Sequence, residues 1–260
     1  MSKTIAMMQP YWFPYFGYFQ LIAGADAFVL GDNLQYVHPG WVNRNRILSA
    51  GAPLLFTLPL KKDASDLAIN QRELADTATD TVGKLLRTLS MNYAKAPYRD
   101  EVLALLQPLL LHPERNLARY LEHSLRGVCA HLRITTPIYV ASSLPVDERL
   151  VEDKQDRVVK LTKHFAGDRY LNAIGGTSLY DGEYFTRRGI ELRFHRMDEL
   201  SYTQFKDPFV PNLSIIDLLM FNDVERLRQW LPCYSTFEPA PSLDSQVFET
   251  HPVKVLEMRP

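Results

Sequence analysis

The 260-residue sequence contains only two cysteines, Cys129 and Cys233, without the spacing of a metal site or a CxxC pair. This usage predicts a reduced protein of the cytosol rather than a disulfide-stabilised secreted domain. No apolar stretch reaches the roughly 18 residues that a membrane-spanning helix needs. The N-terminus, MSKTIAMM, also lacks the apolar run of a signal peptide. We therefore expect a cytoplasmic protein without a membrane span.

Neither charge sign dominates, because 29 Lys and Arg residues face 30 Asp and Glu residues and leave a formal charge of -1. A general nucleic-acid or anionic-membrane surface is not favoured, and we expect no nucleic-acid partner, while a local basic pocket stays open. The length fits one large domain, or one domain with an inserted subdomain.

Four motifs of common enzyme classes are absent from the sequence: GxGxxG, GxxxxGK[ST], HExxH and GxSxG. A dinucleotide oxidoreductase, a P-loop NTPase, a zincin and an α/β-hydrolase are therefore disfavoured. No metal is required by ligand spacing. The cofactor is undetermined, with ATP and Mg²⁺ as one option.

Short apolar runs alternate with amphipathic segments through most of the chain. Residues 4–9 and 27–30 predict buried strands, and a short helix over 17–25 separates them. This βαβ order indicates an α/β fold of three layers with a parallel, Rossmann-like sheet. Further strands are predicted over 54–60, 137–141, 168–173 and 190–195.

Residues 62–133 predict a helical insertion within the α/β core, which comprises 1–61 and 134–230. The predicted helices cover 81–93, 99–111, 116–132, 147–165, 181–188 and 215–222. Residues 231–260 contain several prolines and few periodic apolar positions, and we expect them to wrap the surface or to be partly mobile.

Polar and aromatic residues follow most of the predicted strands. Ligands of open α/β sheets bind beyond the carboxyl ends of the strands, so these residues predict a binding cleft along one rim. A loop before the last predicted helix is expected to fold back on the same rim. The candidate substrate-binding residues are Gln9, Tyr11, Gly17, Tyr18, Gln35, Tyr36, Trp41, Asn43, Arg44, Asn45, Lys61, Gly175, Gly176, Gln204 and Ser214.

Two residues are candidates for catalysis. Asp32 ends a buried strand and fits a general base or a metal-bound carboxylate, with a turn-capping role as the alternative. His38 fits an acid or base, with an ordinary surface histidine as the alternative. Arg44 or Arg46 fits a bidentate clamp for a phosphate or carboxylate, with a surface turn as the alternative.

The loop YWFPYFGYF also has two interpretations. Its large aromatics Trp12, Phe16 and Phe19 suit the core at the corner between sheet and helix. Tyr11 and Tyr18 instead suit a wall for a sugar or base, and Gly17 suits close approach of an anion to backbone N–H groups.

Several motifs occur together in this order: QPYWFPYFGYFQLI, ADAFVLGDNLQY, WVNRN, NYAKAPYRD, YLNAIGGTSLYD and QFKDPFVPNLSIIDLLMFN. The set resembles the WbqC-like family over about residues 4–230. The chain departs from the family pattern at Asn33-Leu34 and at Trp12-Phe13.

The resemblance implies a role in making or decorating a sugar of a surface polysaccharide of the O-antigen type. Acyl or aminoacyl transfer to a nucleotide-linked amino sugar is the favoured reaction. The opening βαβ unit is also similar to HxGH-type nucleotidyltransferases, although its loop lacks both histidines. Adenylation by such an enzyme is one alternative, and a non-catalytic sugar- or partner-binding module is another.

Overall fold

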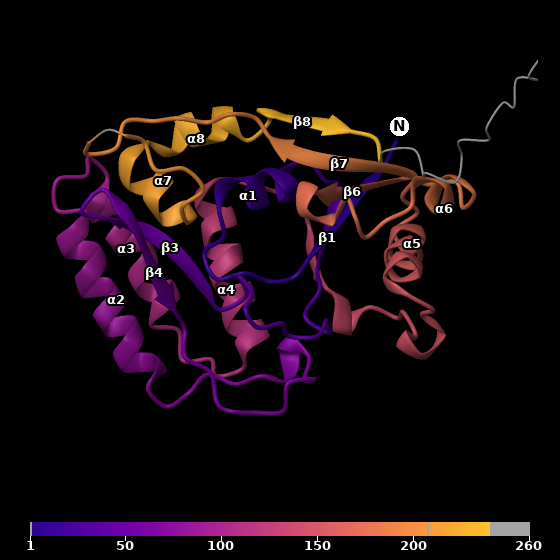
Figure 1. The fold of residues 1–260 in the computed structure, drawn as a ribbon, viewed down its shortest axis with the longest axis horizontal. Helices are drawn as coiled ribbons and strands as arrows, with labels where there is room; N and C mark the ends of the chain where they lie inside the picture. The colour runs from indigo at the N-terminus through magenta and orange to yellow at the C-terminus, as the bar shows by residue number, and fades with distance from the viewer. Residues whose placement is uncertain (1, 207, 240–260) are drawn as a thin grey trace, which may run out of the picture.

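The fold is organised around a six-stranded sheet (Figure 1). The computed structural model describes residues 2–206 and 208–239. The strands in spatial order are β5 (Ile138–Val140), β2 (Ala27–Leu30), β1 (Thr4–Met8), β6 (Arg169–Ala173), β7 (Glu191–Met197) and β8 (Tyr234–Phe237).

Five of these strands are parallel, and β8 runs antiparallel to β7 at one edge. When the parallel strands are counted along the chain, their spatial order is 3-2-1-4-5, which is the Rossmann order. Successive strands are first added on one side of β1 and later on its other side, so the strand order reverses between β1 and β6. The predicted three-layer α/β fold is confirmed.

Side chains of the central strand alternate between two hydrophobic layers, as the pleat of a strand requires. Ile5 and Met7 pack in one cluster with Val158 of α5 (Lys154–His164). Ala6, between them, packs in the opposite cluster with Phe19 of α1 (Phe16–Ala23). Helices therefore cover both faces of the sheet. α6 (Gly182–Thr186) shares the layer of α5.

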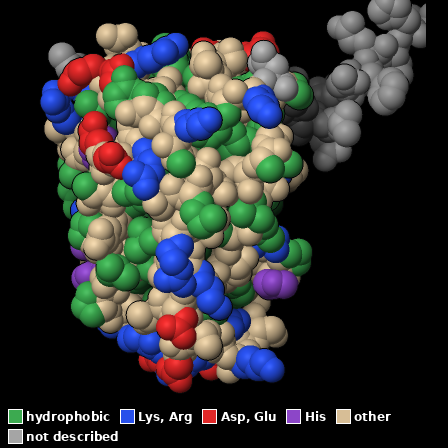
Figure 2. Space-filling view, turned by 90° about the vertical axis from the view of Figure 1, so that its left-hand side faces the viewer, with side chains coloured by type: hydrophobic (Ala, Val, Ile, Leu, Met, Phe, Trp, Pro, Cys, Tyr) green, Lys and Arg blue, Asp and Glu red, His purple; other side chains and the backbone are tan. Residues whose placement is uncertain are grey.

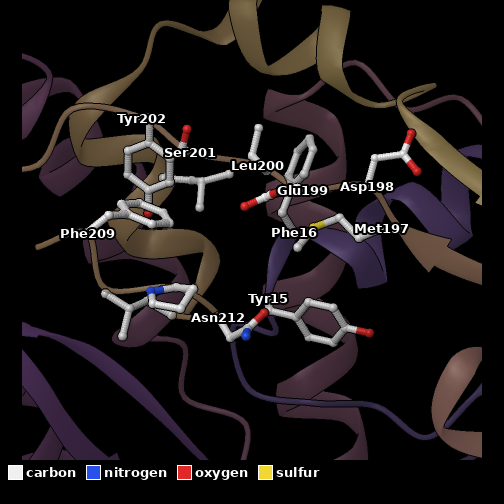
Figure 3. A pocket seen from close by; sticks show the side chains of 13 residues that line it. Tyr15, Phe16, Met197, Asp198, Glu199, Leu200, Ser201, Tyr202, Phe209 and Asn212 are labelled. Carbon is white, nitrogen blue, oxygen red and sulfur yellow. The ribbon is translucent and has the colours of Figure 1, made fainter.

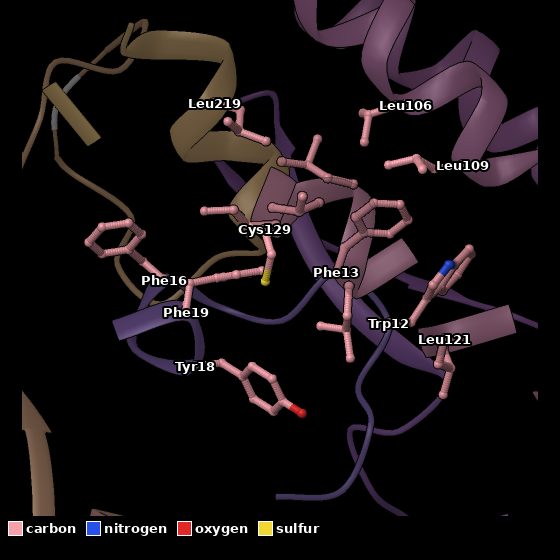
Figure 4. Close-up of a cluster of buried hydrophobic side chains, with 14 of the residues drawn as sticks. Trp12, Phe13, Phe16, Tyr18, Phe19, Leu106, Leu109, Leu121, Cys129 and Leu219 are labelled. Atoms are coloured by element: carbon pink, nitrogen blue, oxygen red, sulfur yellow. The ribbon is translucent and has the colours of Figure 1, made fainter. Parts of the chain in front are cut away.

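The helices α2 (Ala78–Asn92), α3 (Arg99–Leu110) and α4 (Leu117–His131) form between β2 and β5. Their buried residues join one cluster with those of α1 and α7 (Ile215–Phe221), which Figure 4 shows at close range. Asn116 caps α4, because its side chain accepts a hydrogen bond from the Arg119 N–H.

The strand predicted over 54–60 differs in position and in partner. β4 (Ala52–Thr57) pairs antiparallel with β3 (Arg44–Ser49), and the two form a separate hairpin. β3 was not predicted from the sequence. Its inward positions include the polar Asn45 as well as Ile47, so the alternation of apolar and polar residues is incomplete.

Three further elements differ from expectation. The helix predicted over 147–165 is divided into a 3₁₀ turn, η3 (Glu148–Leu150), and α5, which Asp153 caps. α8 (Val224–Trp230) and β8 were not predicted. Residues 240–260, which belong to the tail expected to wrap the surface, lie outside the described residues.

The side of the molecule that carries α2 shows both charge signs among hydrophobic side chains (Figure 2). On this side the acidic side chains gather toward the upper and lower ends. Among the described helices, none combines the length and the apolar character that a membrane crossing requires.

Candidate functional site

A pocket of about 410 Å³ opens at the carboxyl edge of the sheet. The ends of β2 and β5 form one side, while α4 and the 3₁₀ turn η1 (Ile69–Gln71) form the other. Small-molecule sites typically enclose about 300–1,000 Å³, so this volume suits a compact ligand. The polar residues that line it include Asp32, Asn70, Asn116, Arg119, Glu122 and Ser142.

Asp32 is the most buried carboxylate of this pocket, with 4% of its surface exposed. Its Oδ1 accepts the Ser142 N–H at 2.9 Å, and its Oδ2 accepts the Ser142 hydroxyl at 2.5 Å. Asn70 Nδ2 donates a third bond to Oδ2 at 3.0 Å. A carboxylate offers about four acceptor positions, so three of them are filled and the side chain has a fixed orientation.

The register of the sheet brings Asp32 and Ser142 together. Leu30 of β2 lies opposite Val140 of β5 in the parallel ladder. Both strands end at this pair, and two residues further along the chain lie Asp32 and Ser142, the latter within the 3₁₀ turn η2 (Ala141–Ser143). The contact therefore follows from the ladder itself, although 110 residues separate the two positions.

The segment between β2 and β5 completes the pocket from the opposite side. The Asn70 N–H donates to the Asp32 carbonyl at 2.9 Å, and Asn116 Nδ2 donates to the Asn70 carbonyl at 2.7 Å. These bonds connect the start of α4 to the end of β2. Arg119 and Glu122, one turn apart on α4, bring one charge of each sign to the pocket wall.

Both charges of that wall are already paired. Arg119 forms an ion pair with Glu114 at 2.8 Å, and Glu122 forms one with Arg126 at 2.8 Å. Bonding to Glu114 raises the pKa of the Arg119 guanidinium, which stays charged. Surface pairs of this kind are weak, so a ligand group can replace one partner at modest cost.

The loop after β1 contributes large aromatic side chains to the hydrophobic core. Trp12 and Phe13 are 0% and 1% exposed, and the Trp12 ring lies 5.0 Å from that of Phe56. A Cβ atom on Gly17 would lie 2.5 Å from the Tyr15 ring, so close packing accounts for this glycine. Rossmann folds commonly bind phosphate at this position, and here aromatic side chains fill it (Figure 4).

Tyr11 and Tyr18 lie side by side in that loop, with ring centroids 5.7 Å apart. Tyr18 is buried and its hydroxyl donates to the Gln9 carbonyl at 2.8 Å. Burial raises the pKa of both phenols, most strongly that of Tyr18. Tyr11 is only partly buried and so remains the more accessible ring.

Several other predicted site residues hold loops in place. Asn45 Nδ2 and the Ser214 hydroxyl both donate to the Phe13 carbonyl at 2.7 Å. The Tyr36 hydroxyl donates to Asn43 Oδ1 at 2.8 Å, and both residues are buried.

Gln204 donates from Nε2 to the Val210 carbonyl and accepts the Val210 N–H at Oε1. Its Nε2 also donates to Asp217 Oδ2 at 2.9 Å. Asp217 is fully buried and also accepts bonds from the hydroxyls of Tyr93, at 2.6 Å, and Tyr202, at 2.5 Å. Burial raises the pKa of this carboxyl, and the three donors lower it less. Asp217 therefore joins α2, α7 and the loop after β7, a role that the sequence analysis did not identify.

The remaining candidates are not among the residues that line the Asp32 pocket. Lys61 is exposed and pairs with Glu73 at 2.6 Å, and His38 is exposed in the loop before β3. Gln35 is exposed, and its carbonyl accepts a bond from Gln9 Nε2 at 3.3 Å.

The glycine turn after β6 has two different members. Gly175 is exposed, whereas a Cβ atom on buried Gly176 would lie 1.8 Å from Asn172 Nδ2. Close packing of the Asn172 side chain thus accounts for Gly176.

Trp41 and Arg44 lie together at the start of the hairpin.

A second pocket, of about 340 Å³, lies at the carboxyl end of β7 (Figure 3). Tyr15, Phe16 and Tyr202 form aromatic walls, and Asp198 and Glu199 add carboxylates. Its lining includes none of the residues predicted from the sequence as candidates. The lining of the first pocket includes one of those candidates, Asp32.

Asn70 and Arg119 are pocket residues that the sequence analysis missed. Asn70 lies in a polar stretch without periodicity, and Arg119 lies on the polar face of an amphipathic helix, as many surface residues do. Ser142 directly follows the strand predicted over 137–141, and this position was the signal in the sequence that could have placed it in the pocket.

The strand order and the pocket beside the ends of β2 and β5 together define an α/β protein with a Rossmann-type strand order and a pocket at the carboxyl edge of its sheet. The chain belongs to the WbqC-like protein family, whose model matches residues 9–229. A curated relative from Mycobacterium tuberculosis, named uncharacterized protein Rv1507c, is 30% identical over 219 residues, which cover 84% of this chain and 93% of the relative. No solved structure matches the chain significantly.

Proposed function

We propose that the chain is a cytoplasmic enzyme of surface-polysaccharide sugar assembly, and that it transfers an acyl or aminoacyl group to a nucleotide-linked amino sugar. The observation that carries this proposal is the Asp32–Ser142 pair inside the 410 Å³ pocket. Membership of the WbqC-like family supports the substrate class.

The pair suits removal of a proton from an amine. In the reaction, the amine nitrogen attacks the acyl carbonyl carbon, and the bond to the donor's leaving group breaks. The nitrogen also loses a proton, which Ser142 Oγ accepts while its own proton passes to Asp32 over the 2.5 Å bond. General-base assistance of this kind contributes about 10²–10⁴-fold to a rate.

The rest of the pocket suits orientation of a polar ring. Asn116 and Glu122 present amide and carboxylate groups to a sugar, and Arg119 brings a cation. Arg44 and Lys61, which the sequence suggested for substrate binding, are not among the lining residues.

A thermal-shift screen of the purified chain tests the proposal first. The panel contains UDP- and dTDP-linked amino sugars, their hydroxyl counterparts, acyl-CoAs, free amino acids and Mg·ATP. A ligand at 100 times its dissociation constant stabilises a protein by roughly 2.7 kcal/mol, which is a visible shift. We expect a shift with an amino-sugar nucleotide and a smaller one with its hydroxyl counterpart.

Nucleotidyl transfer is a second candidate, because the 3-2-1-4-5 strand order is shared with nucleotide-binding folds. It requires ATP or another nucleoside triphosphate and releases pyrophosphate. A melting shift that needs Mg·ATP, together with release of pyrophosphate, would favour this reaction over acyl transfer.

A further inference from the structure

A pair of arginines on the hairpin lies apart from the Asp32 pocket. Arg44 and Arg46 are separated by one residue on β3 and so point to the same side of the strand. Their guanidinium carbons lie 5.5 and 5.0 Å from the centre of the Trp41 ring. Trp41 is 42% exposed, so the cluster formed by Trp41, Arg44 and Arg46 reaches the surface.

The cluster has no counter-charge within the described part of the chain. Neither Arg44 nor Arg46 forms an ion pair there, although most other arginines of the fold do. Side chains i and i+2 of a strand are about 7 Å apart, so two like charges are held close together. Such an arrangement is unfavourable unless an anion or the aromatic ring offsets the repulsion.

The hydrogen-bonding groups of both arginines are mostly unused. Arg44 Nε donates to the Gly40 carbonyl at 2.7 Å, which fixes the direction of that guanidinium. Arg46 Nε is shielded from solvent and has no partner among the described residues. The terminal nitrogens of both side chains have no protein acceptor in the same residues and are not shielded.

The surroundings of the cluster restrict its ligand. Thr57 and Leu55, opposite Arg44 and Arg46 in the hairpin, are exposed and uncharged. Arginine forks match phosphoryl oxygens in a two-pronged geometry that a point charge does not provide. The net charge of -1 disfavours a long polyanion such as nucleic acid.

We propose that Trp41, Arg44 and Arg46 form a binding site for a phosphoryl group of a small molecule, with one guanidinium on each side of the group. The exposed part of the Trp41 ring then contacts whatever the phosphoryl group carries. The site is separate from Asp32, and occupancy does not depend on any reaction at Asp32.

Titration with inorganic pyrophosphate at low ionic strength, followed by tryptophan emission, tests this site. We expect saturable quenching in the unmodified chain, weaker binding when salt is added, and no saturation with acetate. The double variant Arg44→Gln/Arg46→Gln is expected to bind at least about tenfold more weakly, because both forks are lost. Trp41→Phe is expected to remove the signal.

Arg87→Gln is the matched control for each single variant, Arg44→Gln and Arg46→Gln, since Arg87 on α2 is exposed and its replacement also removes one positive charge. We expect it to bind as the unmodified chain does, and Asp32→Asn likewise. Circular dichroism checks folding, and the single variants Arg44→Gln and Arg46→Gln replace the double variant if it does not fold. Equal affinity in the arginine variants, or saturation by acetate at the same concentration, overturns the proposal.

Discussion

Ser142 donates its hydroxyl to Asp32 across 2.5 Å at the carboxyl edge of the sheet, and its backbone N–H holds the other carboxylate oxygen at 2.9 Å. Both bonds come from one residue, so the carboxylate plane and the hydroxyl have a fixed relation. The outer side of the Ser142 hydroxyl remains available to a ligand, because Ser142 is exposed.

Replacement of either member of this pair is expected to reduce turnover of the amino-sugar substrate found in the screen. Asp32→Asn removes the proton acceptor and Ser142→Ala removes the relay, so each is expected to lower kcat by about 10²–10⁴-fold. Ser143→Ala is the control, since its hydroxyl donates to the Val140 carbonyl instead. Steady-state kinetics with unchanged kcat in both pair variants would remove Asp32 from the mechanism.

The two glycines after β6 are expected to differ in tolerance. An alanine Cβ at position 176 meets Asn172 Nδ2, whereas Gly175 has open space around it. Gly176→Ala is expected to destabilise the fold by about 1–3 kcal/mol through overpacking, and Gly175→Ala by much less. Urea unfolding measures both, and equal stability of the two variants would contradict the packing explanation.

Asn45 and Ser214 are expected to be coupled, because they donate to the same Phe13 carbonyl. Ser214→Ala is expected to cost about 1–2 kcal/mol, since α7 also loses its cap. With both donors removed, the buried carbonyl loses its side-chain partners, so the double variant should cost at least about 0.5 kcal/mol more than the two single costs together. Additive costs in a double-mutant cycle would show that the two bonds act independently.

His195 is expected to make the fold sensitive to acid. Burial lowers the pKa of this imidazole to about 4, against 6.5 for a free histidine. The folded state therefore disfavours the protonated form, so the stability present above pH 6.5 is lost as the pH falls toward 4. The difference corresponds to about 3 kcal/mol.

His195→Leu replaces the imidazole with an apolar side chain of similar size, so no group titrates at this position. The advantage of the unmodified chain over this variant, measured by urea unfolding, is expected to shrink as the pH falls from 7 to 4. A difference that stays constant with pH would mean that His195 does not titrate between the folded and unfolded states.

The βαβ opening, the parallel sheet and most helices could be predicted from the sequence, because their signals are local. Apolar runs such as 4–9 and 27–30 describe strands buried on both faces, and Asn116 and Ser214 are caps readable from residue type. β8 could not be predicted, since an edge strand beside a proline-bearing tail has no such signal.

The sequence alone determined the position of Asp32, because a polar residue two positions after the end of a buried parallel strand lies at the carboxyl edge of the sheet. Only the tertiary structure decided its partners, since Ser142 arrives through the β2–β5 register and Asn70 through the segment that precedes α2. It also decided which distant segments the polar side chains bond to, as Asn45 does with Phe13 and Gln204 with Asp217. The physical reason is that a side chain's hydrogen-bond partner depends on contacts between distant segments, which no local pattern records.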